Sequence, residues 1–174
     1  MHPFFICNKE EIESKLTILC WSGKSEDGSE HYYYDIKSKE EWVLVHYESE
    51  FQGKNLRVLK RIPELSTNEL IEVALTSSDI NNINGAALEL YQKEESKKED
   101  FRDKLIRRLL QIDISTITPF EKERLEIIIY ESSLYDATNR RGILGKHFTE
   151  IEKDADYFKT ISVEAKIILA RLKK

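Results

Sequence analysis

The segment between Asn139 and His147 places four potential cations within nine positions and brackets Ile143 and Leu144 with two glycines. A helix that begins near Gly145 would direct backbone N–H groups and these cations to one spot, which suits an anion or an acidic partner. One hypothesis is therefore an enzyme or anion-binding domain centred on this loop. The alternative is a mobile loop, or arginines paired with nearby carboxylates such as Asp136. The four cations are Arg140, Arg141, Lys146 and His147.

A concentrated acidic segment follows directly. Between residues 150 and 156, four acids against Lys153 give a net charge of −3. On a helix, apolar side chains would face inward and the acids outward; the inward set is Phe148, Ile151, Ala155 and Phe158. Such a stripe is usually a solvated face. We retain the hypothesis that it binds a basic protein partner. The acids are Glu150, Glu152, Asp154 and Asp156.

The sequence lacks the residue spacings that phosphate-binding loops and metal sites require. Gly23-Lys24-Ser25 resembles the end of a P-loop, but Ile18 stands where that motif needs its first glycine. His147 and Glu150 stand three apart in a single copy, which falls short of a metal site built from helices. We therefore expect no catalytic residue, no metal and no cofactor. We interpret Cys7 and Cys20 as ordinary buried thiols.

Composition and net charge limit the classes of partner that the protein is expected to bind. The 174 residues carry a net charge of −5 with 40% hydrophobic residues, which predicts a folded chain and disfavours nucleic acid. Basic residues beside three tyrosines in a row could still bind RNA on a sheet, but no motif supports this. The longest apolar runs are too short to span a membrane, and the start lacks the features of a signal peptide. We expect a cytoplasmic protein; the sequence leaves its oligomeric state open.

The first third of the chain has the two-residue period of β-strands. We expect strands at about 16–22, 31–36, 42–51 and 56–62, with a short helix opened by Asn8. Leu16 fits either that helix or the first strand, and the N-terminal apolar patch fits a strand or a docked tail. In the third strand, Val43 and Val45 point one way and Trp42 and Leu44 the other.

From Pro63 onward the apolar period becomes helical. Capping-box patterns begin at Ser66, Ser96 and Thr118. The segment with Ile127, Ile128 and Ile129 is apolar most of the way round and is expected at the centre of the bundle. The helices predicted are 67–76, 79–94, 97–111, 119–134, 146–159 and 163–172.

These elements predict one α+β domain over residues 1–174, mainly β over 1–63 and all-helical over 64–174. An antiparallel meander of three to four strands would precede a bundle of about six helices. The two parts would be segregated, with no strand of the sheet beyond Ser66.

The stretch Tyr34-Asp35-Ile36 through Glu41-Trp42-Val43-Leu44-Val45-His46, with the basic hairpin and capped helices after it, resembles the small α+β immunity proteins encoded beside bacterial toxins. The helices after Thr67 are also similar to HEAT-type pairs, without self-similarity at a fixed period. The first resemblance covers about residues 1–110 and implies a non-catalytic cytoplasmic protein that blocks one cognate toxin. The leading hypothesis is thus a protein-binding module.

Overall fold

The computed structural model describes residues 3–49 and 54–173. Within them, five antiparallel strands form one sheet in the order β1-β5-β4-β3-β2, and every strand ends before Pro63. The α+β class and the segregation of sheet from bundle are confirmed; the sheet has one strand more than predicted. The strands are β1 (Phe5–Ile6), β2 (Cys20–Lys24), β3 (Glu30–Asp35), β4 (Glu40–Ser49) and β5 (Lys54–Ile62). The helices are α1 (Lys9–Leu16), α2 (Thr67–Thr76), α3 (Ile80–Lys97), α4 (Arg102–Leu110), the short η1 (Ile114–Thr116), α5 (Pro119–Glu131) and α6 (Phe148–Leu172).

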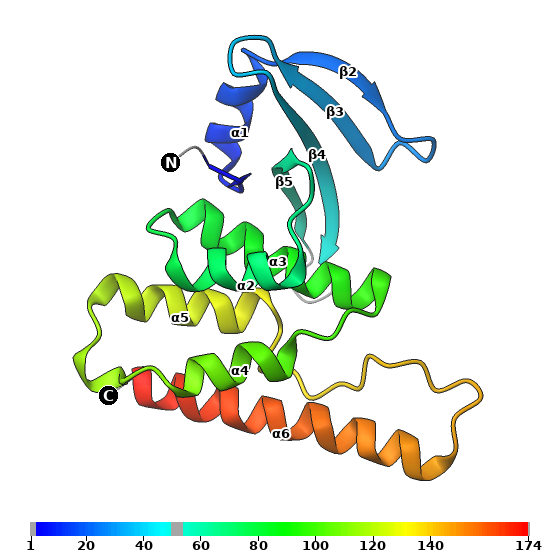
Figure 1. Cartoon of the computed structure of the whole chain (residues 1–174), viewed down its shortest axis with the longest axis vertical. Coiled ribbons are helices and arrows are strands. Elements are labelled where there is room, and N and C mark those ends of the chain that lie inside the picture. The colour runs from blue at the N-terminus through cyan, green and yellow to red at the C-terminus, as the bar shows by residue number, and fades with distance from the viewer. Residues whose placement is uncertain (1–2, 50–53, 174) are drawn as a thin grey trace.

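The alternation of β4 divides its side chains between two cores. Val43 and Val45 join the large core shared with the helices, whereas Trp42 and Leu44 join a smaller core under α1. The sheet is therefore covered on both faces at β4 (Figure 1). Leu16 belongs to α1, so β2 begins at Cys20 rather than near residue 16. Phe51, the predicted end of the third strand, lies outside the described residues.

One edge of the sheet, β1, is sealed by α3. The Asn82 side-chain oxygen accepts hydrogen bonds from the Phe4 and Phe5 N–H groups at 2.7 and 3.1 Å. The Asn81 side-chain oxygen likewise accepts hydrogen bonds from the Cys7 and Asn8 N–H groups at 2.9 and 3.1 Å. At Gly85 the helix comes so close that an added Cβ would lie 2.2 Å from Cγ of Phe5.

The other edge, β2, has no neighbouring element on its outer side among the described residues. Its residues are exposed or half-buried, and the Trp21 side chain is 64% exposed. A bulge between Trp21 and Gly23 interrupts its pairing with β3. Figure 1 shows this end of the sheet curving away from α2 and α3. Cys20 is exposed and Cys7 is half-buried, so the prediction of two buried thiols is wrong for Cys20 and only partly met by Cys7.

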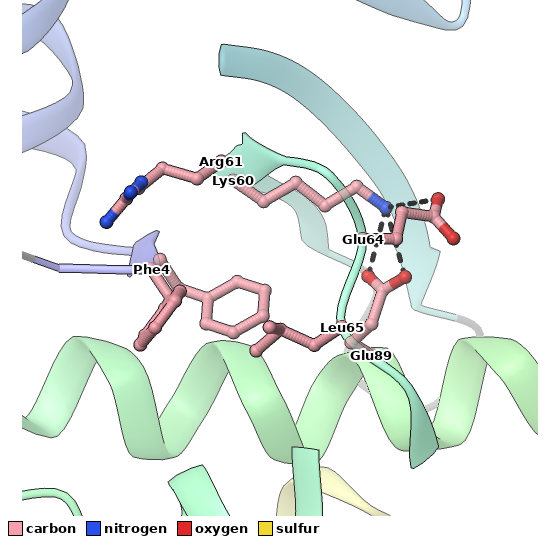
Figure 2. Close-up of a pocket in the computed structure, with 7 residues that line it drawn as sticks. Phe4, Lys60, Arg61, Glu64, Leu65 and Glu89 are labelled. Atoms are coloured by element: carbon pink, nitrogen blue, oxygen red, sulfur yellow. Dashed lines mark hydrogen bonds and ion pairs between the residues drawn. The ribbon is translucent and has the colours of Figure 1, made fainter. Parts of the chain in front are cut away.

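Helix α3 lies between the sheet and α5, and nearly all of its residues from Asn81 to Leu90 are buried. An ion pair buried at this junction joins sheet to helix. Lys60 Nζ of β5 lies 3.0 Å from Oε1 of Glu89 (Figure 2). The Tyr47 hydroxyl donates to the same carboxylate at 2.6 Å. Ile128 and Ile129 of α5 are fully buried as expected, but α3 is the central helix because it packs against both layers.

Two of the three predicted capping boxes are present. Ser66 and Thr118 each accept a hydrogen bond from the backbone N–H of a glutamate that bonds back to the cap. The box at Ser96 is wrong, because α3 continues through Lys97 and α4 begins only at Arg102. Burial of Phe101 and Arg102 sets that start, without a side-chain cap.

The last two predicted helices are one helix, α6. No glycine or proline interrupts it near Thr160, and the Ser162 hydroxyl donates to the Tyr135 carbonyl while the helix continues. Phe158 is buried as predicted and Ile151 is half-buried, but Phe148 and Ala155 are exposed. The first turns of α6 run beside the loop that precedes them rather than inside the bundle, which explains this difference (Figure 1). None of the described helices combines the length and apolar composition needed to span a bilayer.

Candidate functional site

The loop between α5 and α6 is held at its beginning by buried arginine. The Arg102 side chain is fully buried, pairs with Glu94 at 2.8 Å and donates to the Ser133 carbonyl at 2.8 Å. Further along, Arg140 donates to Glu95 at 2.7 Å and to Asp136 at 2.6 Å, and its guanidinium lies 4.9 Å from the centre of the Tyr91 ring. Burial opposes the charge of Arg140, but these hydrogen bonds outweigh it and raise its pKa.

The end of the loop is held by Asp154 of α6. This carboxylate accepts from Arg141 at 2.7 Å and from Lys146 at 2.6 Å. Arg141 also pairs with Asp100 at 2.7 Å and lies 4.4 Å from the centre of the Tyr157 ring. The hydrogen bonds from Lys146 and Arg141 lower the pKa of Asp154, so this clamp is charged at neutral pH.

This arrangement bears directly on the anion-binding hypothesis. Arg140, Arg141 and Lys146 do come close to the start of α6, as that hypothesis requires, but each already has at least one carboxylate partner. The His147 ring caps α6 by accepting from the Thr149 N–H. An incoming anion would have to displace these carboxylates and would leave their charges unpaired. The geometry therefore matches the alternative in which the arginines pair with neighbours such as Asp136.

Between the clamped ends, the loop presents large apolar side chains to solvent. Leu144 is 99% exposed and Ile143 is 61% exposed, at the tip bracketed by the two glycines. Phe148, in the first turn of α6, is 67% exposed. Burying such side chains is worth about 1.5–3 kcal/mol each, so three of them on one held segment mark a surface suited to binding. We call Ile143, Leu144 and Phe148 the apolar tip.

The predicted acidic residues divide into two pairs. Glu150 accepts from the His147 N–H as part of the helix cap, and Asp154 belongs to the clamp. Glu152 and Asp156 are exposed, and within residues 3–49 and 54–173 no hydrogen bond or ion pair engages their carboxylates. Because positions 148, 152 and 156 are spaced by four, Phe148, Glu152 and Asp156 share one face of α6. Two carboxylates thus extend the apolar tip along the helix.

The pocket beside the Lys60–Glu89 pair is too small for a substrate. It is lined by Phe4, Phe5 and Leu65 together with the charged groups, and its volume is about 10 Å³, roughly the space of one water (Figure 2). Burial and the neighbouring Glu89 carboxylate raise the pKa of Tyr47. The network joins β4, β5 and α3, and its contacts are those of a structural support. In the described part of the chain, no group of three histidine, cysteine or acidic residues could hold a metal ion.

Comparisons of this chain with family models, with curated proteins and with solved structures give no match. The interpretation of the surface therefore comes from its own geometry.

The structure gives the charged groups of the predicted segment a different role from the one expected from the sequence. It emphasised the cations and the four acids, whereas the structure uses the cations and Asp154 to hold the loop and leaves Leu144 at its tip. The signal was present in Gly142-Ile143-Leu144-Gly145, two large apolar residues between glycines in a polar loop. Apolar residues in such a context are not expected in the hydrophobic core, because they do not belong to the periodic apolar pattern of a helix or a strand.

Proposed function

We propose that this protein is a non-catalytic protein-binding module that docks a basic partner through the apolar tip and the adjoining acids Glu152 and Asp156. The observation that carries the proposal is the full exposure of Leu144 on a loop fixed at both ends by ion pairs. A loop held in one conformation loses little further entropy on binding, so more of the contact energy is retained as affinity.

The chemistry of the partner follows from this surface. An apolar depression would receive Leu144 and Phe148, and lysines or arginines at its rim would face the two carboxylates. Apolar anchors supply most of the binding energy, whereas charges at a rim mainly raise the association rate. The resemblance of about residues 1–110 to immunity proteins implies a cognate bacterial toxin as the partner that is covered and blocked. That resemblance assigns no functional residue, so the surface itself is argued from its own exposure and charge. Enzymatic or anion-binding activity at the same loop is the less favoured alternative, since its cations are already paired.

The experiment is a pull-down from the native host with the tagged full chain, read by mass spectrometry, followed by kinetic measurement on the captured protein. Leu144→Ser combined with Phe148→Ser is expected to weaken binding at least about 100-fold, from the loss of about 3 kcal/mol or more of apolar burial. Leu110→Ser, another exposed apolar position, serves as the matched control and leaves affinity unchanged. Equal affinity of the double variant and the parent would refute the proposal.

The acidic part has its own test. Glu152→Lys combined with Asp156→Lys is expected to slow association at low salt and to have little effect at high salt, because salt screens exposed charges over about 10 Å at 0.1 M. Both side chains are exposed, so the melting temperature stays near that of the parent. An association rate equal to the parent's at low salt would mean that these acids are only solvated surface.

A further inference from the structure

A second surface lies on the uncovered end of the sheet, on the side that faces the helices. An open groove of about 410 Å³ runs along it, lined by Ser22, Tyr32, Tyr33, Tyr34, Glu41, Trp42 and Ile62. This volume is within the usual range for ligand sites. Tyr32 and Tyr34 lie on the same face as Glu41, whereas Trp42 belongs to the core on the other face of the sheet. The lining residues include one carboxylate and no cation.

Strand pairing places the Tyr34 ring next to the Glu41 carboxylate. Tyr34 of β3 is the direct partner of Glu41 on β4, and Glu41 is in turn the partner of Ile62 on β5. Side chains of directly opposite residues have Cβ atoms about 4.5–5.5 Å apart and lie on the same face. An aromatic ring and a carboxylate therefore stand side by side at this end of the sheet.

Neither group is engaged by the rest of the described chain. No hydrogen bond or ion pair in residues 3–49 and 54–173 involves the Tyr34 hydroxyl or the Glu41 carboxylate. Neighbouring acids are engaged: Glu40 pairs with Arg61 at 3.1 Å, and Glu30 accepts from the Tyr32 hydroxyl. Glu41 thus differs from its neighbours in leaving an exposed negative charge beside an accessible ring.

Elsewhere in this protein, an arginine side chain lies against a tyrosine ring and carboxylates at two places. Arg141 lies over the Tyr157 ring while it pairs with Asp154 and Asp100. Arg140 combines the Tyr91 ring with Glu95 and Asp136 in the same way. The planar guanidinium suits this combination because it stacks on a ring and still directs N–H groups at a carboxylate.

We propose that the Tyr34–Glu41 groove binds an arginine side chain of a polypeptide partner. The guanidinium would stack on Tyr34 and donate hydrogen bonds to Glu41, while the aliphatic part of the side chain packs toward Ile62. The inference concerns a different surface from the apolar tip and does not depend on the proposed function. A partner that is basic could meet both surfaces, but each is tested separately.

The test is an NMR titration of the labelled full chain with N-acetyl-arginine methylamide and with the citrulline analogue, which has nearly the same shape and no charge. The arginine compound is expected to shift the amide signals of Tyr32, Tyr34 and Glu41 saturably, with a dissociation constant on the order of millimolar. The affinity for the citrulline compound should be lower by a factor of at least about ten. Equal binding of the two compounds, or shifts centred elsewhere, would overturn the proposal.

Variants locate the charge that matters. Glu41→Gln should weaken binding of the arginine compound about ten-fold, and Tyr34→Leu should also weaken it while the remaining spectrum stays that of the parent. Glu123→Gln removes the same charge from an exposed position on α5 and should leave binding unchanged. Parent-like binding by Glu41→Gln would overturn the assignment of this carboxylate.

Free arginine distinguishes a peptide site from an amino-acid site. Free arginine has a charged α-ammonium and α-carboxylate where the blocked compound has amides. A site that recognises only the side chain should therefore bind free arginine no more tightly than the blocked compound. Tighter binding of free arginine would overturn the polypeptide part of the proposal.

Discussion

One edge strand of the sheet, β1, is covered by a helix, whereas the other, β2, is exposed. At β1, Asn81 and Asn82 of α3 satisfy four backbone N–H groups and Gly85 lets the helix close against the strand. At β2, no described element covers the strand, and Trp21 and Cys20 face solvent. An exposed edge is a site where another chain can pair, so folded proteins usually protect it. The contrast indicates that β1 serves stability, whereas the β2 end of the sheet is available for interaction.

The largest expected difference between the two edges is in the reactivity of their cysteines, since Cys7 follows β1 and Cys20 begins β2. Burial, with nearby carboxylates, raises the pKa of Cys7 to about 12, so only about one part in 10⁴ is thiolate near pH 8. Because the thiolate is the reactive form and Cys20 is exposed, iodoacetamide should alkylate Cys20 at least about ten-fold faster than Cys7. Peptide mass spectrometry over time measures both rates. In denaturing urea the two rates should converge; a rapid reaction of Cys7 in the native protein would mean that the β1 edge opens.

Gly85→Ala should destabilise the protein by about 1–3 kcal/mol, because the new methyl group would overlap Phe5. Helix propensity alone predicts the opposite sign, a gain of about 0.5–1 kcal/mol. Urea unfolding measures the change, with Asn84→Ala at the adjacent half-buried position as the control. A stabilised Gly85→Ala variant would show that α3 and β1 are not in close contact.

Asn82→Ala should lower the free energy of unfolding by about 1–3 kcal/mol, since the Phe4 and Phe5 N–H groups lose their acceptor. Asn82→Asp keeps an acceptor oxygen in place and is expected to retain more of the stability than alanine. The same urea titration compares the two. Equal losses for both would indicate that packing of the side chain, rather than its oxygen, seals the edge.

Trp21→Ser, at the open edge, should change the free energy of unfolding by no more than about 0.5 kcal/mol, because this side chain is mostly exposed. Thermal or urea unfolding is sufficient to detect a larger effect. A loss above about 1 kcal/mol would mean that Trp21 contributes to the fold and that β2 is not a free surface.

The contrast between the edges also shows where sequence reasoning was sufficient. The two-residue alternation of β4 predicted which side chains face each core, since a strand fixes that pattern locally. The capping boxes at Ser66 and Thr118 are local in the same sense. The sealing of β1 could not be predicted, because Asn82 and Phe5 are 77 residues apart. Its one signal was Asn81-Asn82 at the start of an apolar helix, where asparagine is a poor helix former.

For the candidate surface the same distinction holds. The sequence identified the loop and the acidic helix, but the pairing of Arg141 and Lys146 on one carboxylate depends on how α6 lies against the loop. The error at Thr160 had the same origin: residues 160–162 permit a helix, and only packing decided that it continues. The Tyr34–Glu41 pair required the exact register of β3 against β4, which a one-residue slip would have broken.

The position of α3 has a consequence for how the molecule opens. Because this helix packs against β1, α2 and α5, neither layer can separate without exposing its buried residues. Its amide hydrogens should therefore exchange with solvent deuterium only when the whole chain unfolds, whereas those of β2 exchange through local fraying. In a protein built in this way, the end of the sheet can fluctuate while the centre remains closed.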